Sequence, residues 1–473
     1  MVKISIRYHI IRAGERGRLG KISACPQKIP GPPRIRPDGR CVAKRRNCAG
    51  GGFVKKGGYL LLIAGALTLA AAWLAREPAP PPFTCTDAIG CLDIGPGEPV
   101  KLGVIESLTG EVATLGQEQV RGLKLALARR GDKLLGHSVA LQIEDTGCTP
   151  EGGANAAMRI TADPKVAAIF GTTCSCDAAT AAQVASQAGL SMISGNNSAP
   201  YLTALCGQKA PCWQNGYLRT APNEEASGPT AARFAYEKLG VRLAATINDG
   251  DIYTKGLTDG FQTEFERQGG KVVLSATVDK IDSDMGPVLA AVKNSKAGLV
   301  FFPLFQPEGN YLLLTARKTP DLRNVILMSD GALIDDTFIA AVGQAAVGMY
   351  FVGPTPPPDS PAATKLTGEY LARYRENPPT IYHLSAFDAA EILFDALEKT
   401  AVKDPDGSLH LPRQALRAAL YATAGYEGVS GRLTCDRFGD CARPSFDVLR
   451  LDDPAMGVTG LKANAVFTYA PDK

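Results

Sequence analysis

Short apolar stretches alternate with amphipathic stretches along most of the chain after residue 100. The apolar stretches are rich in β-branched residues and end at glycine, proline or polar residues, which is typical of buried strands. Between them, apolar residues recur at helical spacing, as Val120, Leu123 and Leu127 do. The pattern predicts strands at 100–105, 139–144, 166–170, 191–194, 242–247, 271–278, 299–302 and 325–328. It predicts helices at 117–130, 153–161, 178–188, 224–239, 254–268, 285–294, 308–318, 361–375, 384–400 and 412–424.

Strands and helices in strict alternation specify parallel sheets with helices on both faces, so the fold class is α/β. The pattern stops near Arg219 and restarts after Pro222, which indicates two Rossmann-like lobes. The helices after the proline-rich stretch at 353–358 have few strands between them, and we expect them to pack on the first lobe. For the tail we expect a hairpin of 432–434 with 446–451 in the second lobe.

These assignments divide the chain into a first lobe of residues 99–220 plus 355–429 and a second lobe of residues 221–354 plus 430–473. The chain then crosses between the lobes three times, near Arg219, Pro354 and Gly428. Several crossings make a hinge that bends without letting the lobes separate.

An uncharged apolar run at residues 59–75 follows Lys55 and Lys56, while residues 76–98 form a proline-rich linker. This arrangement predicts a signal peptide or a membrane anchor, with the rest of the chain outside the cytoplasm. The run alone does not distinguish a cleaved signal from a retained anchor.

The net charge of +4 is unevenly distributed among the 473 residues, because residues 1–58 hold 15 Lys and Arg against 2 Asp and Glu. The rest of the chain is acidic, which excludes a basic nucleic-acid-binding body. The basic head is either a disordered tail or the product of a misplaced start. No methionine lies between Met1 and Met158, so translation from Val54 would give a well-formed signal peptide.

Enzyme motifs are missing from the sequence. It holds no GxSxG, HExxH or P-loop motif, and the three histidines beyond the head, His137, His383 and His410, lie far apart. We therefore expect a protein that is not an enzyme and has no cofactor.

Nine of the twelve cysteines lie beyond the head, as suits an oxidising compartment. Six of them form C-x5-C pairs, which predict the disulfides Cys85–Cys91, Cys206–Cys212 and Cys435–Cys441. A Cys148–Cys174 bridge would tie two neighbouring strand ends and leave Cys176 as the odd thiol. The alternative, a zinc ion on these last three cysteines, has no convincing fourth ligand.

Polar and aromatic residues follow several predicted strands at the edge where parallel sheets bind ligands. Ser175 begins a helix after strand 166–170 and can offer its hydroxyl and backbone N–H to a carboxylate, although taken alone it is better explained as an ordinary N-cap. Ser198 follows the next strand. Tyr253, Phe305 and Asp330 follow three successive strands of the second block, and an acid with aromatics suits an ammonium group.

Residues 100–451 resemble the substrate-binding proteins of branched-chain-amino-acid ABC importers, the leucine/isoleucine/valine-binding type. The resemblance rests on an ordered set of segments: KLGVIESLTGEVATLG (101–116), EDTGCTP (144–150), FGTTCSC (170–176), MISGNNSAPYLT (192–203), LRTAPNEEASGPTAA (218–232), NDGDIYTKGL (248–257), FPLFQPEG (302–309), LMSDGAL (327–333) and YHLSAFDAAEILFDAL (382–397). It implies a type I periplasmic-binding fold, a disulfide like Cys148–Cys174, and permease and ATPase subunits as partners.

The resemblance also implies roles for residues in the loops. Serines matching Ser175 and Ser198 hold the ligand carboxylate, and residues matching Tyr253, Phe305 and Asp330 hold its ammonium group. Phe305 stands where a tyrosine is usual, and Leu115 where some members have an aromatic residue. The candidate ligand-binding residues are Leu115, Cys174, Ser175, Asn197, Ser198, Tyr253, Phe305 and Asp330.

We therefore expect a monomeric extracytoplasmic protein that captures a small amino acid for an ABC importer, without metal or nucleic acid. Two alternatives share this fold: a membrane-tethered ligand sensor, and a binder of amides, urea or aromatic acids.

Overall fold

The computed structural model describes residues 83–357 and 360–471 of the chain. The predicted head (1–58) and apolar run (59–75), the start of the linker, and Cys25, Cys41 and Cys48 lie outside the described residues. Within the described ranges, no helix combines the length and the apolar composition needed to cross a membrane.

The first lobe is built on a six-stranded sheet with the strand order β3-β4-β2-β5-β6-β9. Five of its strands run parallel and only β3 pairs antiparallel with β4, which confirms the α/β class. The strands are β2 (Val100–Glu106), β3 (Lys133–Leu134), β4 (His137–Asp145), β5 (Val166–Gly171), β6 (Met192–Ser194) and β9 (Tyr217–Arg219).

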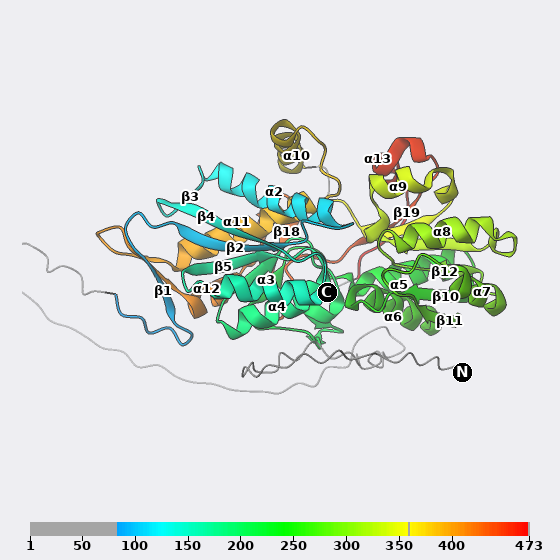
Figure 1. Ribbon diagram of the computed structural model, residues 1–473, viewed down its shortest axis with the longest axis horizontal. Helices are drawn as coiled ribbons and strands as arrows, with labels where there is room; N and C mark the ends of the chain where they lie inside the picture. The colour runs from blue at the N-terminus through cyan, green and yellow to red at the C-terminus, as the bar shows by residue number, and fades with distance from the viewer. Residues whose placement is uncertain (1–82, 358–359, 472–473) are drawn as a thin grey trace, which may run out of the picture.

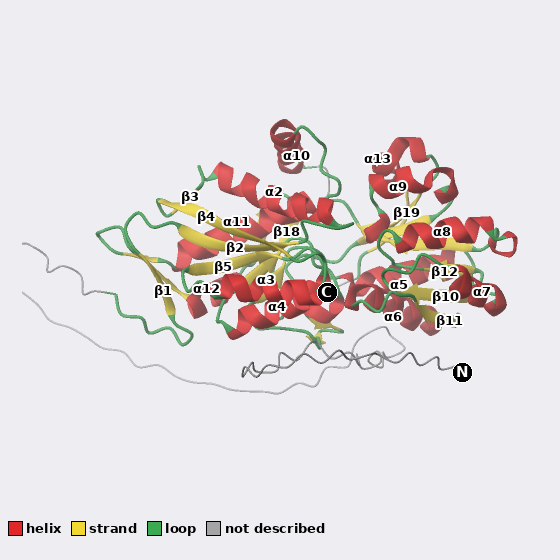
Figure 2. Ribbon diagram, in the orientation of Figure 1, coloured by secondary structure: helices red, strands yellow, loops and turns green. Residues whose placement is uncertain are grey.

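Helices cover both faces of this sheet, because successive residues of its central strands point to opposite faces. Leu102 and Val104 of β2 pack in one apolar cluster with α2 (Ala113–Arg129) and α11 (Tyr382–Thr400). Ile105 packs in another cluster with α3 (Pro150–Thr161) and α4 (Ser175–Gln187). Figure 2 shows the two helix pairs on opposite sides of the strands. The prediction that the late helices pack on the first lobe is confirmed for all three, α10 (Pro361–Tyr374), α11 and α12 (Arg413–Tyr421).

The second lobe is built on a seven-stranded sheet with the order β11-β10-β12-β13-β14-β19-β20. The first five strands are parallel, and β19 and β20 add antiparallel edge strands. The strands are β10 (Leu243–Asn248), β11 (Lys271–Thr277), β12 (Leu299–Phe301), β13 (Ile326–Asp330), β14 (Tyr350–Pro354), β19 (Phe446–Arg450) and β20 (Ala465–Tyr469). The helices are α5 (Ser227–Arg233), α6 (Ile252–Arg267), α7 (Gly286–Ser295), α8 (Glu308–Lys318), α9 (Asp336–Val342) and α13 (Gly457–Ala463). Figure 1 shows this lobe on the right and the first lobe on the left.

The predicted tail hairpin is wrong. Strand β18 (Gly431–Leu433) pairs with β17 (Tyr426–Gly428), whereas β19 pairs with β14 and β20. The reason is a tight turn between β17 and β18, where Asp388 of α11 accepts hydrogen bonds from the backbone N–H groups of Val429 and Ser430.

Because of this turn, residues that we expected in the second lobe pack elsewhere. Leu433, Cys435 and Cys441 belong to the apolar cluster of the first lobe, so the last crossing lies between Cys441 and Phe446 instead of near Gly428. The other lobe boundaries stay predictions.

The described part of the linker forms structure that the pattern did not predict. Its strand β1 (Cys91–Ile94) pairs antiparallel with β16 (Leu409–Pro412) of the first lobe, and β15 (Val402–Lys403) completes this small sheet. The ring of Phe83 stacks on His410 at 4.3 Å between centroids. The linker is thereby attached to the end of the first lobe that lies far from the second lobe (Figure 1).

Three predicted disulfides join described cysteines: Cys85–Cys91, Cys148–Cys174 and Cys435–Cys441. The zinc alternative is therefore wrong. The predicted Cys206–Cys212 bridge is also wrong, because none of the disulfides between described residues joins this pair. Cys206 occupies a tight turn at φ 50°, between the short strands β7 (Ala204–Leu205) and β8 (Gln208–Lys209), whereas Cys212 is buried in an apolar cluster. Cys176 is a buried free thiol.

Candidate ligand-binding cleft

A cleft of about 720 Å³, counting the space at its open mouth, lies where loops of the two lobes face each other. The first wall consists of residues from the first lobe and the second wall of residues from the second lobe. Thr380 lies just before α11, and Tyr382 is the first residue of that helix. Six of the eight predicted residues line the cleft: Leu115, Cys174, Ser175, Ser198, Tyr253 and Phe305. The lining residues that the sequence did not suggest are Glu111, Val112, Thr114, Thr173, Asn196, Gln306, Gly331, Ala332, Ile334, Asp335, Thr380 and Tyr382.

The first wall places a helix N-terminus in the cleft. Ser175 is the first residue of α4, and Cys174 before it is held by its disulfide to Cys148. The hydroxyl of Ser175 accepts a hydrogen bond from the N–H of Ala199 at 3.2 Å, so its own proton can be donated to a ligand. Free N–H groups and the positive end of the helix dipole favour an anion here.

Close packing behind this wall fixes the loop that precedes α4. Gly171, at φ 133°, leaves only 2.0 Å between an added Cβ and the carbonyl oxygen of Ile105, so no other residue fits there. The hydroxyl of Thr173 accepts a hydrogen bond from the N–H of Ser107 and donates one to buried Glu106. The position of Ser175 is thus set by contacts below the loop.

Asn197 does not line the cleft, contrary to its place among the predicted residues. Its side chain is buried, donates to the carbonyl of Cys174 at 2.8 Å and accepts from the hydroxyl of Tyr217 at 2.9 Å. The neighbouring Asn196 lines the cleft instead and donates to the carbonyl of Thr173 at 3.1 Å. Asn197 therefore fixes the loop on which Ser198 is carried.

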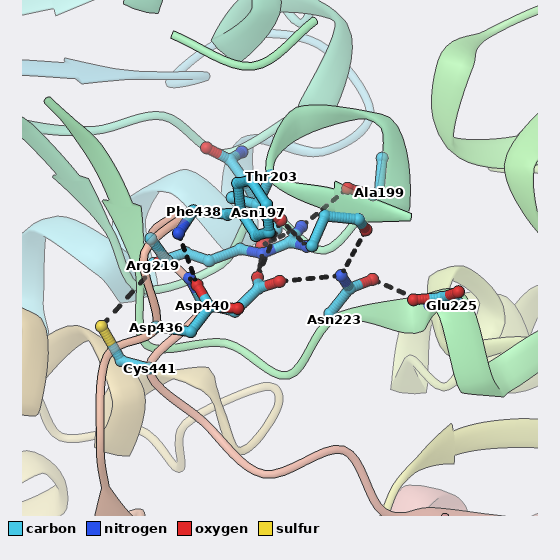
Figure 3. Close-up of polar contacts among 12 residues, drawn as sticks. Asn197, Ala199, Thr203, Arg219, Asn223, Glu225, Asp436, Phe438, Asp440 and Cys441 are labelled. Carbon is cyan, nitrogen blue, oxygen red and sulfur yellow. Dashed lines mark hydrogen bonds and ion pairs between the residues drawn. The ribbon is translucent and has the colours of Figure 1, made fainter. Parts of the chain in front are cut away.

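A buried ion pair anchors this loop from the other side (Figure 3). The guanidinium group of Arg219, which has no exposed surface, contacts Asp440 at 2.6 Å and donates to the carbonyl of Ala199 at 2.7 Å. Asn223 donates to the second oxygen of Asp440 at 2.9 Å. The loop that holds Ser198 is thus tied to the tail segment that precedes the last crossing.

Aromatic rings and one acid form the second wall. Tyr253 lies in the first turn of α6, where Asp251 caps the helix by accepting its N–H at 2.9 Å. The ring of Phe305 is 5.5 Å from the ring of Tyr253, measured between centroids. The hydroxyl of Tyr253 donates a short hydrogen bond to Asp330 Oδ2.

Asp330 lies behind Tyr253 and does not itself line the cleft, although the next residues, Gly331 and Ala332, do. It has no exposed surface, and its Oδ1 atom has no hydrogen-bond partner among the described residues. Burial raises the pKa of Asp330 above its ordinary value, against the lowering effect of the Tyr253 hydroxyl. A buried acid in this position can hold an ammonium group that enters beside Tyr253.

The sequence interpretation missed a second acid at this point. Glu224 is buried, and burial together with the charge of Asp330 raises its pKa. One polar residue in a polar segment gives no pattern that predicts burial, so the sequence offered no signal for its role.

Comparisons with known proteins identify the family of this chain. Residues 99–444 match a protein family described as periplasmic binding protein. The Leu/Ile/Val-binding protein BraC3 of Rhizobium johnstonii is 26% identical over 354 residues, which cover 74% of this chain and 91% of that protein. The Leu/Ile/Val-binding protein of Escherichia coli K12 is 24% identical, with 74% and 90% covered.

Solved structures share the fold. The leucine-binding protein LivK of Thermotoga maritima superposes with a TM-score of 0.65 at 24% identity, covering 75% of this chain and 96% of that one. A solute-binding protein of an R. palustris ABC transporter, solved with 4-hydroxybenzoate, gives a TM-score of 0.64 at 19% identity, covering 79% and 98%. Since the family match extends over well more than half of its length, this chain belongs to the periplasmic binding protein family.

Proposed function

We propose that this protein is the extracytoplasmic substrate-binding subunit of an ABC importer and that it captures a small amino acid between its lobes. The observation that carries the proposal is the complementary chemistry of the two walls. Hydroxyl groups and a helix N-terminus face the cleft from one side, and an aromatic pair backed by a buried acid faces it from the other. A zwitterion presents the matching charges.

In this arrangement the ligand carboxylate binds Ser175, Ser198 and the first N–H groups of α4. The ammonium group lies against the rings of Tyr253 and Phe305 and in reach of Asp330. Leu115 and Ile334 provide apolar surface for the ligand side chain. Closure of the lobes buries the ligand. Because the ligand binds the closed state more tightly than the open state, it shifts the protein to the closed conformation, which the permease recognises.

The partners follow from the proposal. An importer of this kind requires permease and ATPase subunits, and a monomeric binding protein delivers its ligand to the permease outside the cytoplasm. We expect residues 59–75 to export the chain or to anchor it.

A thermal-shift panel of the full-length chain tests the function. The panel comprises the twenty standard amino acids, small amides, urea and hydroxybenzoates, and each hit is followed by calorimetric titration. We expect the largest stabilisation from an apolar amino acid, because Leu115 and Ile334 line the cleft. A ligand stabilises the folded state by RT ln(1 + c/Kd), where c is its free concentration, so the tightest binder gives the largest shift. Stabilisation by urea or by amides alone would contradict the proposal.

An aromatic acid is the second candidate, since Tyr253, Phe305 and Tyr382 line the cleft. Two solved relatives from R. palustris strains are complexes with 4-hydroxybenzoate and p-hydroxybenzoic acid. Such a ligand brings a carboxylate but no cation, and it would leave Asp330 without a partner. The amino acid is therefore the better match.

A further inference from the structure

Two buried carboxyl groups lie within reach of one phenol hydroxyl beside the cleft. Asp330 has no exposed surface and Glu224 is 3% exposed. Asp330 Oδ1 and Glu224 Oε2 each lack a hydrogen-bond partner among the described residues. Unpartnered buried carboxyl oxygens are costly, so their persistence at a cleft points to a ligand that satisfies them.

The position of Glu224 connects the two walls. It is the first residue of the short 3-10 helix η2 (Glu224–Ala226), just after the first crossing, and its N–H donates to the carbonyl of Ser198 at 2.9 Å. The hydroxyl groups of Ser198 and Tyr253 lie close enough to its carboxyl group to lower its pKa, against the larger raising effect of burial. Since Ser198 and Tyr253 both line the cleft, Glu224 lies between the proposed carboxylate and ammonium sites.

No cation neutralises this pair. Within the described residues, neither carboxyl group takes part in an ion pair, and the cation that acts on Glu224, Arg219, is bound to Asp440. The other titratable groups that face the pair are the phenols of Tyr253 and Tyr382, which cannot supply positive charge. Burial raises the pKa of both carboxyl groups, and their repulsion adds to this effect at Glu224. Without a cation beside it, the pair therefore retains a proton near pH 7.

We propose that Glu224 is the second acid of the ammonium site, that it shares one ligand ammonium group with Asp330, and that the pair restricts the cleft to ligands carrying such a group. This inference rests on the proposed function and makes Glu224 a specificity-determining residue. When the ammonium group enters, the carboxyl O–H bond breaks and the proton passes to the buffer base, while the ammonium group keeps its own protons.

Amino acids and aromatic acids then differ in the sign of their proton exchange. An amino acid releases a proton on binding, so its affinity falls when the pH drops and the pair becomes fully protonated. 4-Hydroxybenzoate has no cation and binds only when the pair is neutral, so its affinity falls when the pH rises.

Calorimetric titration of the full-length chain tests the inference. The probe is L-leucine or, if another standard amino acid gives a larger thermal shift, that amino acid. Titrations at about pH 6.5 in phosphate and in Tris, whose ionisation enthalpies differ, count the protons released. We expect release by the wild type, and at least a tenfold loss of affinity with less release for Glu224→Gln.

Glu225→Gln is the matched control. Glu225 accepts a hydrogen bond from the N–H of Cys206 at 2.6 Å, away from the cleft, and glutamine keeps an acceptor oxygen there. We expect its affinity and its proton count to equal those of the wild type. If Glu224→Gln does not fold, as circular dichroism would show, Asp330→Asn together with the proton count of the wild type decides the matter.

The outcomes separate the two proposals. Unchanged amino-acid affinity and proton release in Glu224→Gln overturn the inference but leave the proposed function intact. Tight binding of 4-hydroxybenzoate by a wild type that binds no amino acid overturns both.

Discussion

The carboxyl group of Asp330 is the single group on which the proposed amino-acid specificity most depends. We expect Asp330→Ala to lower amino-acid affinity at least tenfold, equivalent to about 1.4 kcal/mol, because the bound ammonium group would lose its buried anion. Calorimetric titration measures the loss. The exposed Asp279→Ala is the control, and equal affinities in the two variants would remove Asp330 from the site.

Asn197 illustrates how neighbouring residues acquire opposite roles. Because its amide group satisfies Cys174 and Tyr217 in a buried setting, we expect Asn197→Ala to lower the free energy of unfolding by about 1–3 kcal/mol. Denaturant titration checks this value. The exposed Asn294→Ala should cost less than about 0.5 kcal/mol, and a similarly small effect at Asn197 would contradict its structural role.

Single residues were predictable only where a strand end fixed them. Ser175, Tyr253 and Phe305 follow buried strands, and the sheet edge brings them together as expected. Asn197 rather than Asn196 is turned away from the cleft because it accepts a hydrogen bond from Tyr217. The two residues are twenty positions apart, so the local sequence does not predict this contact. Glu224 was missed for the same reason, because the two lobes together bury it.

At the scale of elements, the parallel strands were predictable and the tail was not. Apolar runs such as 166–170 are too short for a buried helix and end at glycine, so their pattern indicates buried strands. Strand β18, in contrast, pairs with β17 because Asp388 accepts hydrogen bonds from the turn between them. Asp388 lies more than forty residues away in the chain, so the local sequence does not indicate this contact. Strand β20 lies at a sheet edge and has no buried residue, so it lacks the apolar pattern by which a strand is recognised.

Asp177, in the first turn of α4, makes the folded state less stable as the pH rises, whereas most carboxyl groups in folded proteins have the opposite effect. Burial raises the pKa of Asp177 from 3.8 to about 7, so the folded protein binds a proton there that the unfolded chain releases. The stabilisation that this proton gives the folded state is complete below about pH 4. It is lost as the pH rises to about 7, by at most about 1.4 kcal/mol per pH unit.

We therefore expect the free energy of unfolding to be lower at about pH 8 than at about pH 5, and Asp177→Asn to reduce this difference. Denaturant titrations at the two pH values measure it. Asp406→Asn, at a fully exposed carboxyl group, is the control. A slope that stays the same in Asp177→Asn would show that other groups cause it.

At the scale of the whole molecule, the crossings between lobes depend on the buried pair of Arg219 and Asp440. Removing one partner leaves an uncompensated buried charge, so we expect Asp440→Ala to cost about 3–5 kcal/mol of unfolding free energy. The half-exposed pair of Lys101 and Asp163 provides the comparison, and Asp163→Ala should cost less than about 1 kcal/mol. Equal losses in denaturant titrations would contradict a special role for the hinge pair.

The attachment of the linker through β1 has a mechanical consequence. Among the described residues, β1 pairs with β16 of the first lobe and with no strand of the second lobe, so the linker from Phe83 onward is attached to the first lobe. A force applied at Phe83 therefore loads the first lobe directly and leaves the second lobe free to swing. If the protein is tethered to a membrane, the first lobe is the stationary base and the second lobe does the moving when a ligand is caught or released.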